Sequence, residues 1–382
     1  MRGGVGSLAA TVAVAALAGA CAEPEAEVAS FEVTDSAGIR IVRNLGASGV
    51  RGQLSSVPSA TIGTDSLTLY QVAGGILTSD GGFVLVSSGD QQLLYFDGDG
   101  AFVRRAGARG DGPGEFQSIS WIRGRADGGL TLADARANRV TALGAAGELM
   151  WVRPFNPTVP PKPDPRAFIT PPSPLAALDD GRILGFPVTF TIPDGVAGPM
   201  PTVGTLMLYA PDLTQLADLG PVTLIMHWED PTAQMPFARY LGAARVHFAA
   251  RGDRFAYTDI VGPSVNVVDG GARTMIIREN RSRHPFVPDS IPRGAFAVDS
   301  LPTYQDIKVD ARGRVWTLVA PPSEGVDREW RLFGVDGVAV GSLLLPADAV
   351  LLDADDTRVL LLRRDDFEVE TVELWDVSWS EP

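Results

Sequence analysis

The sequence contains little of the chemistry that most catalytic and metal sites use. Its 382 residues include one cysteine and three histidines, His227, His247 and His284. A single cysteine cannot form a disulfide within the chain, and imidazole metal sites normally recruit several histidines at defined spacing. The patterns H-x-H, H-E-x-x-H, G-x-S-x-G and the EF-hand loop are absent. The sequence therefore gives no support for a thiol or serine nucleophile, or for a histidine-based metal centre.

Basic residues are also in deficit. The chain has 32 Lys and Arg against 46 Asp and Glu, a formal net charge of −14. Because phosphate binding needs cations in excess, this balance argues against a nucleic-acid partner. The contents of 45% hydrophobic and 20% charged residues are those of a folded globular protein. No segment has a sustained apolar period of 3.6 residues, so the predicted fold class is all-β.

The first 21 residues have the features of an export signal. Arg2 provides a positive charge, and the stretch from Val5 to Ala20 is apolar or small and carries no charge. This stretch is short for a membrane-spanning helix. It ends in LAGAC, which resembles the cleavage box of bacterial lipoproteins with its leucine, Leu17, one place upstream of the usual position. The resemblance implies cleavage before Cys21 and a lipid on its sulfur. An ordinary signal peptide with a chance cysteine is the alternative.

Three parts are therefore expected in the chain. Residues 1–20 would be the lipoprotein-type signal peptide, 21–35 a lipidated flexible tether and 36–382 the folded domain. The protein would be exported and anchored in the bacterial cell envelope, with the lipid as its only contact with the membrane.

A short turn followed by an apolar, β-rich run occurs six times along the domain. Gly and Asp supply the positive-φ turn of a hairpin, and the Val, Leu and Phe residues after it supply a strand. The copies are DGGFVLV (80–86), DGGLTLA (127–133), DDGRILGF (179–186), RGDRFAY (251–257), ARGRVWTLV (311–319) and DADDTRVLLL (353–362). Successive turns lie 47, 53, 71, 61 and 43 residues apart. One unit of about four short strands per copy fits this spacing, which predicts a six-bladed β-propeller.

The sixth unit is one strand short, so the ring needs a closing strand from elsewhere. ATIG (60–63) is predicted to supply it, and IRIVRN (39–44) to add to the same edge. Closure of this kind leaves no free sheet edge at the seam. The proline-rich run 154–174 is predicted to be a surface loop and not a strand, 193–204 a further insert, and 226–240 a long loop between blades.

The second unit, DGGLTLADARANRVTALGAAGEL, resembles an NHL repeat. Asp134, Asn138 and Arg139 occupy the positions where that family has its Asp-x-x-x-Asn-Arg group. GDGPGEF resembles the segment between neighbouring blades in six-bladed propeller lipoproteins of the NHL and TolB-like kind. The resemblance implies the fold, and it implies that the three residues tie a loop to the neighbouring blade. It implies no activity, because propellers host many unrelated functions.

The glycine-rich run GARGDGPGEF (107–116) suggests a phosphate cradle or an adhesion motif. A phosphate cradle needs a helix after the glycine loop, whereas this run leads into the strand-like QSISWIRG. The Arg-Gly-Asp tripeptide recurs at 251–253, where a repeat hairpin accounts for it. We therefore interpret the run as the crossing between the first and second blades.

The predicted function is noncatalytic binding or scaffolding of a protein, peptide or glycan at one face of the ring. Aromatic and charged residues on the loops of that face are the candidates. They are Tyr70, Trp121, His227, Trp228, Arg239, Tyr240 and Tyr304. The alternative is a propeller hydrolase or lyase with a divalent metal in the central channel, which needs carboxylates or imidazoles converging from several blades. No cofactor is predicted. Calcium on carboxylates stays open, although most Asp residues lie in Asp-Gly turns, where they stabilise the backbone.

Overall fold

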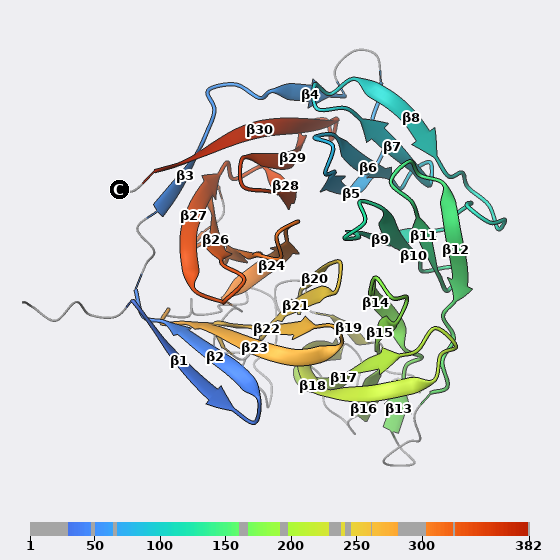
Figure 1. Cartoon of the computed structure of the whole chain (residues 1–382), viewed down its shortest axis with the longest axis vertical. Helices are drawn as coiled ribbons and strands as arrows, with labels where there is room; N and C mark the ends of the chain where they lie inside the picture. Colours follow the sequence, from blue (N-terminus) through green and yellow to red (C-terminus); the bar gives the residue numbers. More distant parts are fainter. Residues whose placement is uncertain are drawn as a thin grey trace, which may run out of the picture.

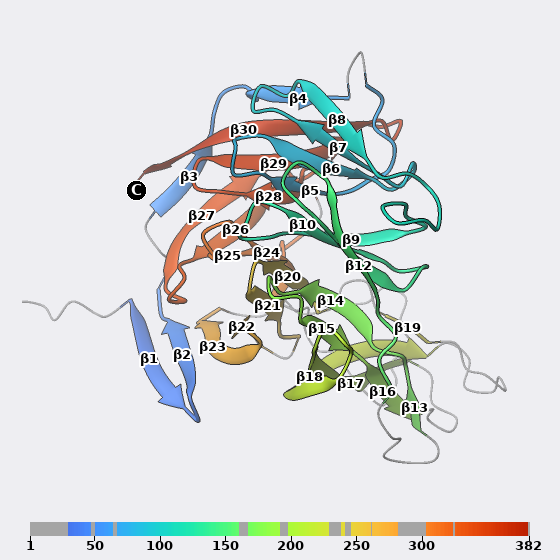
Figure 2. The same ribbon diagram turned by 45° about the vertical axis from the view of Figure 1, so that its right-hand side comes forward.

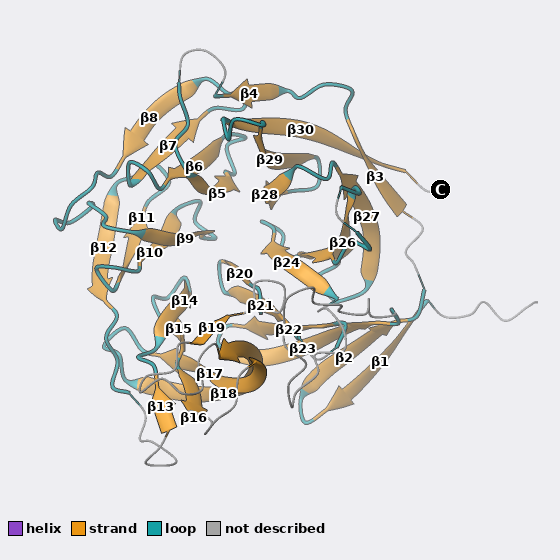
Figure 3. Ribbon diagram, turned by 180° about the vertical axis from the view of Figure 1, so that it is seen from behind, coloured by secondary structure: helices purple, strands orange, loops and turns teal. Residues whose placement is uncertain are grey.

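A computed structural model of the chain arranges its β-sheets in a ring, each radiating outward from a common axis (Figure 1). It describes residues 30–46, 50–63, 67–159, 167–191, 198–228, 238–240, 246–260, 262–281, 303–323 and 325–380. The predicted signal peptide, Cys21 and most of the tether lie outside these residues. All the regular secondary structure in the described part is β-strand (Figure 3). It contains no helix long and apolar enough to cross a membrane.

Blades 1 and 2 are regular four-stranded antiparallel sheets. Blade 1 contains β5 (Val72–Leu77), β6 (Phe83–Ser87), β7 (Gln92–Phe96) and β8 (Phe102–Ala106), and blade 2 contains β9 (Ile119–Gly124), β10 (Leu130–Asp134), β11 (Arg139–Leu143) and β12 (Leu149–Pro154). Each blade begins at the axis and ends at the rim, as the repeat predicts. The glycine-rich run connects β8 to β9, where Phe116 is fully buried, so the interpretation of this run as a crossing agrees with the structure.

Blade 3 is the enlarged blade. Its four main strands are β14 (Ser173–Ala177), β15 (Ile183–Phe186), β17 (Gly198–Tyr209) and β18 (Gln215–Trp228), and the added strands are β13 (Ala167–Ile169), β16 (Val188–Thr191) and β19 (Ala238–Tyr240). The prediction that 154–174 contains no strand is wrong, because β13 pairs with β16. The prediction of a loop over 226–240 is wrong at both ends, because β18 extends to Trp228 and pairs with β19.

Blades 4, 5 and 6 complete the ring. Blade 4 contains β20 (Phe248–Arg251), β21 (Arg254–Thr258), β22 (Ser264–Asp269) and β23 (Ala272–Glu279). Blade 5 contains β24 (Tyr304–Val309), β25 (Val315–Val319), β26 (Arg328–Phe333) and β27 (Ala339–Leu345). Blade 6 contains β28 (Val350–Ala354), β29 (Arg358–Arg364) and β30 (Glu370–Ser380). The six repeat turns thus correspond to six blades, which confirms the predicted fold.

Blade 6 receives its fourth strand from the N-terminal part of the chain. β4 (Ala60–Ile62) pairs antiparallel with β30, with Ala60 opposite Leu374 and Ile62 opposite Val372. The predicted closure by 60–63 is therefore confirmed. A second N-terminal strand, β3 (Val50–Leu54), pairs with both β27 and β30 and joins blade 5 to blade 6.

The strand formed by residues 39–44 does not join that edge. β2 (Ile39–Asn44) pairs in parallel with β23 at the rim of blade 4, and β1 (Phe31–Ser36) pairs with β2 on its outer side (Figure 2). Val42 explains the position, because it is completely buried in the cluster that contains Met275 and Ile277. Residues 31–35, which we expected in the flexible tether, belong to β1.

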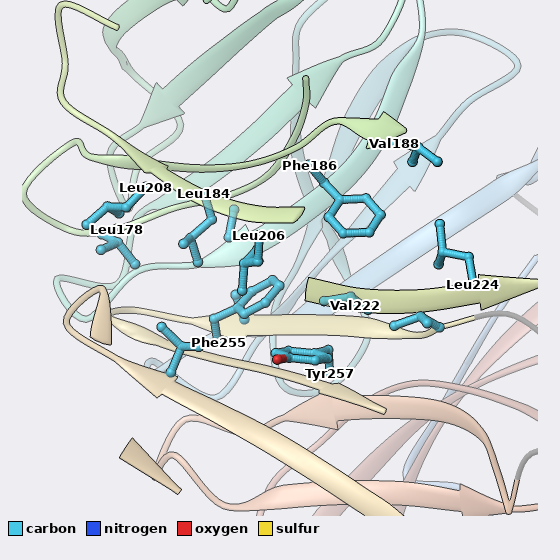
Figure 4. Close-up of a cluster of buried hydrophobic side chains, with 14 residues drawn as sticks. Leu178, Leu184, Phe186, Val188, Leu206, Leu208, Val222, Leu224, Phe255 and Tyr257 are labelled. Atoms are coloured by element: carbon cyan, nitrogen blue, oxygen red, sulfur yellow. The ribbon is translucent and has the colours of Figure 1, made fainter. Parts of the chain in front are cut away.

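The core of the described part is divided into six apolar clusters, one between each pair of neighbouring blades. The cluster between blades 3 and 4 shows the pattern (Figure 4). Leu184 and Leu206 of blade 3 face Phe255 and Tyr257 of blade 4 across the gap between the sheets. Burial of apolar area between adjacent sheets thus stabilises the ring without a single central core.

Candidate binding site in the central channel

The inner strands of five blades enclose a cavity of about 250 Å³ on the ring axis. Its lining residues come from β5, β9, β20, β24 and β28. Ala73 and Ser120, which border the cavity, are exposed, so the cavity communicates with solvent. β14 of blade 3 provides no lining residue, because the chain at the end of β20 lies directly against blade 2. The Gly252 N–H donates to the Gly124 carbonyl at 2.9 Å.

Five charged side chains lie in or beside this cavity. Its lining includes Arg123, Lys308 and Asp353, and Arg251 and Asp306 pair with two of these residues. Arg123 lies on β9, Arg251 on β20, Asp306 and Lys308 on β24 and Asp353 on β28. Lys308 Nζ lies 3.0 Å from Asp306 Oδ2, two residues away on the same face of its strand. These side chains give the channel three cations and two carboxylates.

Arg251 lies next to the cavity, because its partner Asp353 is a lining residue. Its guanidinium donates to Asp353 Oδ2 at 2.9 Å and to the Leu77 carbonyl at 2.7 Å, so that it joins blade 4 to blades 6 and 1. Burial raises the pKa of Asp353, while Arg251 and the Leu77 and Ala354 N–H groups lower it. Arg251 also borders a second cavity of about 430 Å³ on the far side, formed by the repeat turns.

Charged residues that line this second cavity, or lie beside it, make contacts between neighbouring blades. Arg312 and Arg314 both pair with Asp356, Arg254 donates to the Gly313 carbonyl at 2.7 Å, and Asp253 accepts from the Asp179 N–H at 2.8 Å. In the described part of the chain, no group of three or more His, Cys, Asp or Glu side chains is arranged to hold a metal ion.

Arg123 has a different environment from the other two cations of the channel. Its guanidinium donates to the carbonyl oxygens of Ile122 at 3.1 Å and Phe248 at 3.2 Å, and to no carboxylate. Its Nε is buried and has no hydrogen-bond partner. Burial lowers the pKa of Arg123 to about 10, an effect that Asp306 and Asp353 partly offset. Arg123 therefore remains a cation at neutral pH.

The structure describes the side chains of three of the seven predicted binding residues, Tyr70, Trp121 and Tyr304. Tyr70, just before β5, is 54% exposed and its ring lies over Gly89. Trp121 lies in β9 and not in a loop; its side chain is half-buried, borders the channel, and donates from Nε1 to the Pro174 carbonyl at 2.8 Å. Tyr304 was predicted to lie on a loop of the binding face, but it begins β24 and is 1% exposed, with its hydroxyl donating to Glu279 Oε2 at 2.7 Å. Tyr304 is therefore a core residue.

The other four predicted residues belong to strands and not to a loop. The backbones of His227 and Trp228 lie in β18, and those of Arg239 and Tyr240 in β19. Strand β18 pairs His227 with Arg239. Their side chains lie outside the described part of the structure.

The NHL-like group holds the crossing between blades 1 and 2. The buried Asp134 carboxylate accepts from the N–H groups of Gln117 at 2.8 Å and Ser118 at 3.0 Å. Arg139 donates to the Asp111 and Glu115 carbonyls in the glycine-rich run. Asn138 has a φ of 48° and turns the chain between β10 and β11. These contacts correspond to the structural role that the resemblance implies.

Sequence reasoning missed Arg123, Arg251 and Lys308. Arg251 belongs to the second Arg-Gly-Asp copy, which we interpreted as a plain turn. A usable signal was present, because each of these cations lies near the end of an inner strand, just before a repeat turn. Inner strands surround the axis of a propeller, so a charge at that position is directed to the channel or its mouth.

Comparison with known proteins agrees with the architecture. Residues 62–141 match the model of a family described as a six-bladed β-propeller (DUF5128). A search of curated proteins finds no match. A crystal structure from Bacteroides fragilis, described as a candidate exported protein, has a TM-score of 0.51 and 12% identity over 89% of this chain and 99% of its own. A DUF4221 family member from Bacteroides vulgatus has a TM-score of 0.51 and 11% identity over 92% of this chain and 99% of its own. At these identities the likeness shows the fold alone.

Proposed function

We propose that this protein is an exported, lipid-anchored binding module of the bacterial cell envelope and that its ligand occupies the central channel. Export and anchoring rest on the N-terminal segment, with Arg2, an uncharged apolar stretch and Cys21 in LAGAC. The Bacteroides fragilis protein with the same fold is itself described as a candidate for export.

The observation that carries the binding role is the shape of the channel cavity. It is accessible beside Ala73 and Ser120, and Arg123, Lys308 and Asp353 reach it from three different strands. A cavity with a few polar groups converging from different strands is the usual form of a small-ligand site. Apolar side chains, including Trp121 and Leu352, complete its wall.

The alternative function, a hydrolase or lyase with a divalent metal in the channel, requires carboxylates or imidazoles that are free to coordinate. Asp306 is paired with Lys308 and Asp353 with Arg251, so each carboxylate that faces the channel has a cation as its neighbour. A divalent metal at this position would meet three positive side chains. The charge distribution favours binding over metal-assisted catalysis.

Obstruction of the channel tests the binding role. The full chain, extracted in mild detergent, would be screened by thermal unfolding against small acids, neutral sugars and short peptides. Ala73→Trp should abolish the stabilisation by any ligand found, because Ala73 is exposed and borders the cavity. The rim variant Phe367→Trp is the control, since Phe367 is 87% exposed on blade 6. A stoichiometric divalent metal whose removal lowers the Tm would contradict the binding-only function.

The lipid anchor has its own test. Cys21→Ser removes the sulfur that would carry the lipid. We expect the wild-type chain to incorporate labelled fatty acid and to sediment with membranes, and the variant to do neither. Equal behaviour of the two chains would contradict lipidation.

A further inference from the structure

Arg123 contributes an uncompensated positive charge to the channel. Of the three cations, Arg251 is paired with Asp353 at 2.9 Å and Lys308 with Asp306 at 3.0 Å. Among the described residues, the Arg123 guanidinium donates hydrogen bonds only to carbonyl oxygens, and its buried Nε has no hydrogen-bond partner. A guanidinium has five N–H donors, and taking it out of water is costly unless an anion or acceptors replace the lost hydration. This site therefore favours a ligand that brings negative charge.

The charges nearby limit how much negative charge the ligand carries. The two carboxylates of the channel, Asp306 and Asp353, act on Arg123 electrostatically and would repel a second negative charge on the ligand. With three cations and two carboxylates, a single negative charge makes the channel neutral. A monoanion fits this balance better than a phosphate dianion does.

The size and the other walls of the cavity indicate an organic ligand. At about 250 Å³ the cavity is smaller than the roughly 300–1,000 Å³ of sites for drug-sized molecules. Trp121, Val350 and Leu352 provide apolar surface beside the charged groups. The guanidinium of Arg123 lies 5.5 Å from the Trp121 ring, which holds the planar group against an aromatic wall.

We propose that the channel binds a small organic monocarboxylate, with the carboxylate on Arg123 and the apolar part of the molecule against Trp121, Val350 and Leu352. The planar fork of arginine matches a carboxylate through two parallel N–H···O bonds, and Nη1 and Nη2 of Arg123 each keep one N–H beyond the one that donates to a carbonyl. This inference rests on the proposed binding function and specifies the chemical class of its ligand.

Matched acids and amides test the ligand class. The full chain in mild detergent would be titrated with acetate, lactate, pyruvate and benzoate, and in parallel with their primary amides and with sodium chloride. We expect at least one carboxylate to raise the Tm by about 2 °C near ten times its Kd, and the amides and chloride to have no effect. An amide that stabilises as well as its acid would overturn the carboxylate assignment but leave channel binding intact. No response to any of the acids would overturn the assignment as well.

Two arginine variants locate the carboxylate. Arg123→Gln removes the proposed partner and should weaken acid binding by about 30-fold or more, the effect of removing one partner of a buried charge pair. Arg105→Gln, on the exposed outer strand β8, changes net charge equally and should bind like the wild type. Equal loss of acid binding in both variants, or no loss in a folded Arg123→Gln, would overturn the proposal.

If Arg123→Gln does not fold, Ala73→Leu provides a second test. This variant keeps Arg123 and should still block acid binding, because the larger side chain fills the cavity. Unchanged acid binding in Ala73→Leu would overturn the proposal, because the carboxylate would then bind outside the channel.

Discussion

Arg251 of blade 4 and Asp353 of blade 6 form an ion pair at the axis of the propeller, with Nη1 2.9 Å from Oδ2. The two blades are not neighbours, and the same guanidinium donates to the Leu77 carbonyl of blade 1 at 2.7 Å. The Arg251 side chain is 12% exposed and that of Asp353 is 3% exposed. One arginine therefore connects three blades beside the channel cavity and also borders the cavity at the repeat turns.

Removal of Arg251 should destabilise the ring. Arg251→Met leaves the Asp353 carboxylate buried without its cation, and loss of one partner of a buried pair typically costs about 3–5 kcal/mol in the free energy of unfolding. The double variant Arg251→Met/Asp353→Leu should recover much of this loss, because no buried charge remains. Urea unfolding of the wild type and the variants gives the coupling energy. If the effects of the two substitutions simply add, the pair makes no special contribution.

Asp353 should also make stability depend on pH. Its pKa in the folded protein is raised above the ordinary 3.8 by burial, so the folded state binds the proton more tightly than the unfolded state. The contribution of Asp353 to stability is therefore largest at acidic pH and decreases as the pH rises from about 3.8 through the raised value. Asp353→Asn should lack this component, since Asn does not titrate.

The comparison of wild type with Asp353→Asn isolates this group from the other carboxylates. Asp80, Asp127 and Asp355 have lowered pKa values because of their hydrogen bonds, and their contribution to stability is lost as the pH falls. These groups are the same in both chains and cancel in the difference. When unfolding free energies are measured from neutral to acidic pH, the wild type should become more stable relative to Asp353→Asn as the pH falls. A constant difference would show that the pKa of Asp353 is not raised.

The fold could be predicted because its signals are local. Five of the six repeat turns, each between the first and second strands of a blade, contain a positive-φ glycine, and Gly81 and Gly128 have φ of 95° and 83° at the first two. The missing strand of blade 6 made a closing strand from the N-terminal part necessary, and β4 supplies it. The pairing of β2 with β23 had no such signal. That pairing depends on the burial of Val42 in the cluster between blades 4 and 5, whose residues are far from Val42 in the sequence.

The site could be predicted only in part because propeller side chains obtain their partners from other blades. Tyr304 is an aromatic residue of the kind common in binding sites, yet its hydroxyl donates a hydrogen bond to Glu279 of blade 4 within the core. Arg123 has the pattern of an ordinary strand residue, and the Phe248 carbonyl that receives its hydrogen bond is 125 residues away. Contacts at such separations are set by the order of the blades and leave no mark in the spacing of residues.

Tyr304→Phe tests the corrected role of this residue. Glu279 also pairs with Arg331 at 2.8 Å, so it keeps a cation when the tyrosine hydroxyl is lost. We expect a loss of about 1.5–3 kcal/mol in the free energy of unfolding, the contribution of a hydrogen bond to a charged group. Ligand binding in the channel should not change. Weaker binding without a loss of stability would return Tyr304 to the binding site.

The glycines of the crossing between blades 1 and 2 should differ in how much an alanine substitution destabilises the fold. Gly107 has a φ of +80°, and a Cβ there would lie 2.6 Å from the Phe116 ring. Gly114 has a φ of +78° with open space around it, and Gly112 has no positive φ. Gly114→Ala should therefore cost about 1 kcal/mol from backbone strain, and Gly107→Ala more because strain and overlap combine. Thermal unfolding ranks the three alanine variants, and Gly112→Ala as the most destabilising would contradict this account.

The closing strand β4 should be essential to the ring although it is only three residues long. Ile62 is 5% exposed and packs in the cluster shared by blades 6 and 1, whereas Thr61 next to it is exposed. Ile62→Ala removes buried apolar atoms at the seam and should cost about 2–5 kcal/mol in the free energy of unfolding. Thr61→Ala, in the same strand, should change it by no more than about 0.5 kcal/mol. If the seam holds the ring together, Ile62→Ala should also increase hydrogen exchange in β30, because that strand becomes an exposed edge whenever β4 detaches. Unchanged exchange in β30 would mean that blade 6 is stable without its fourth strand.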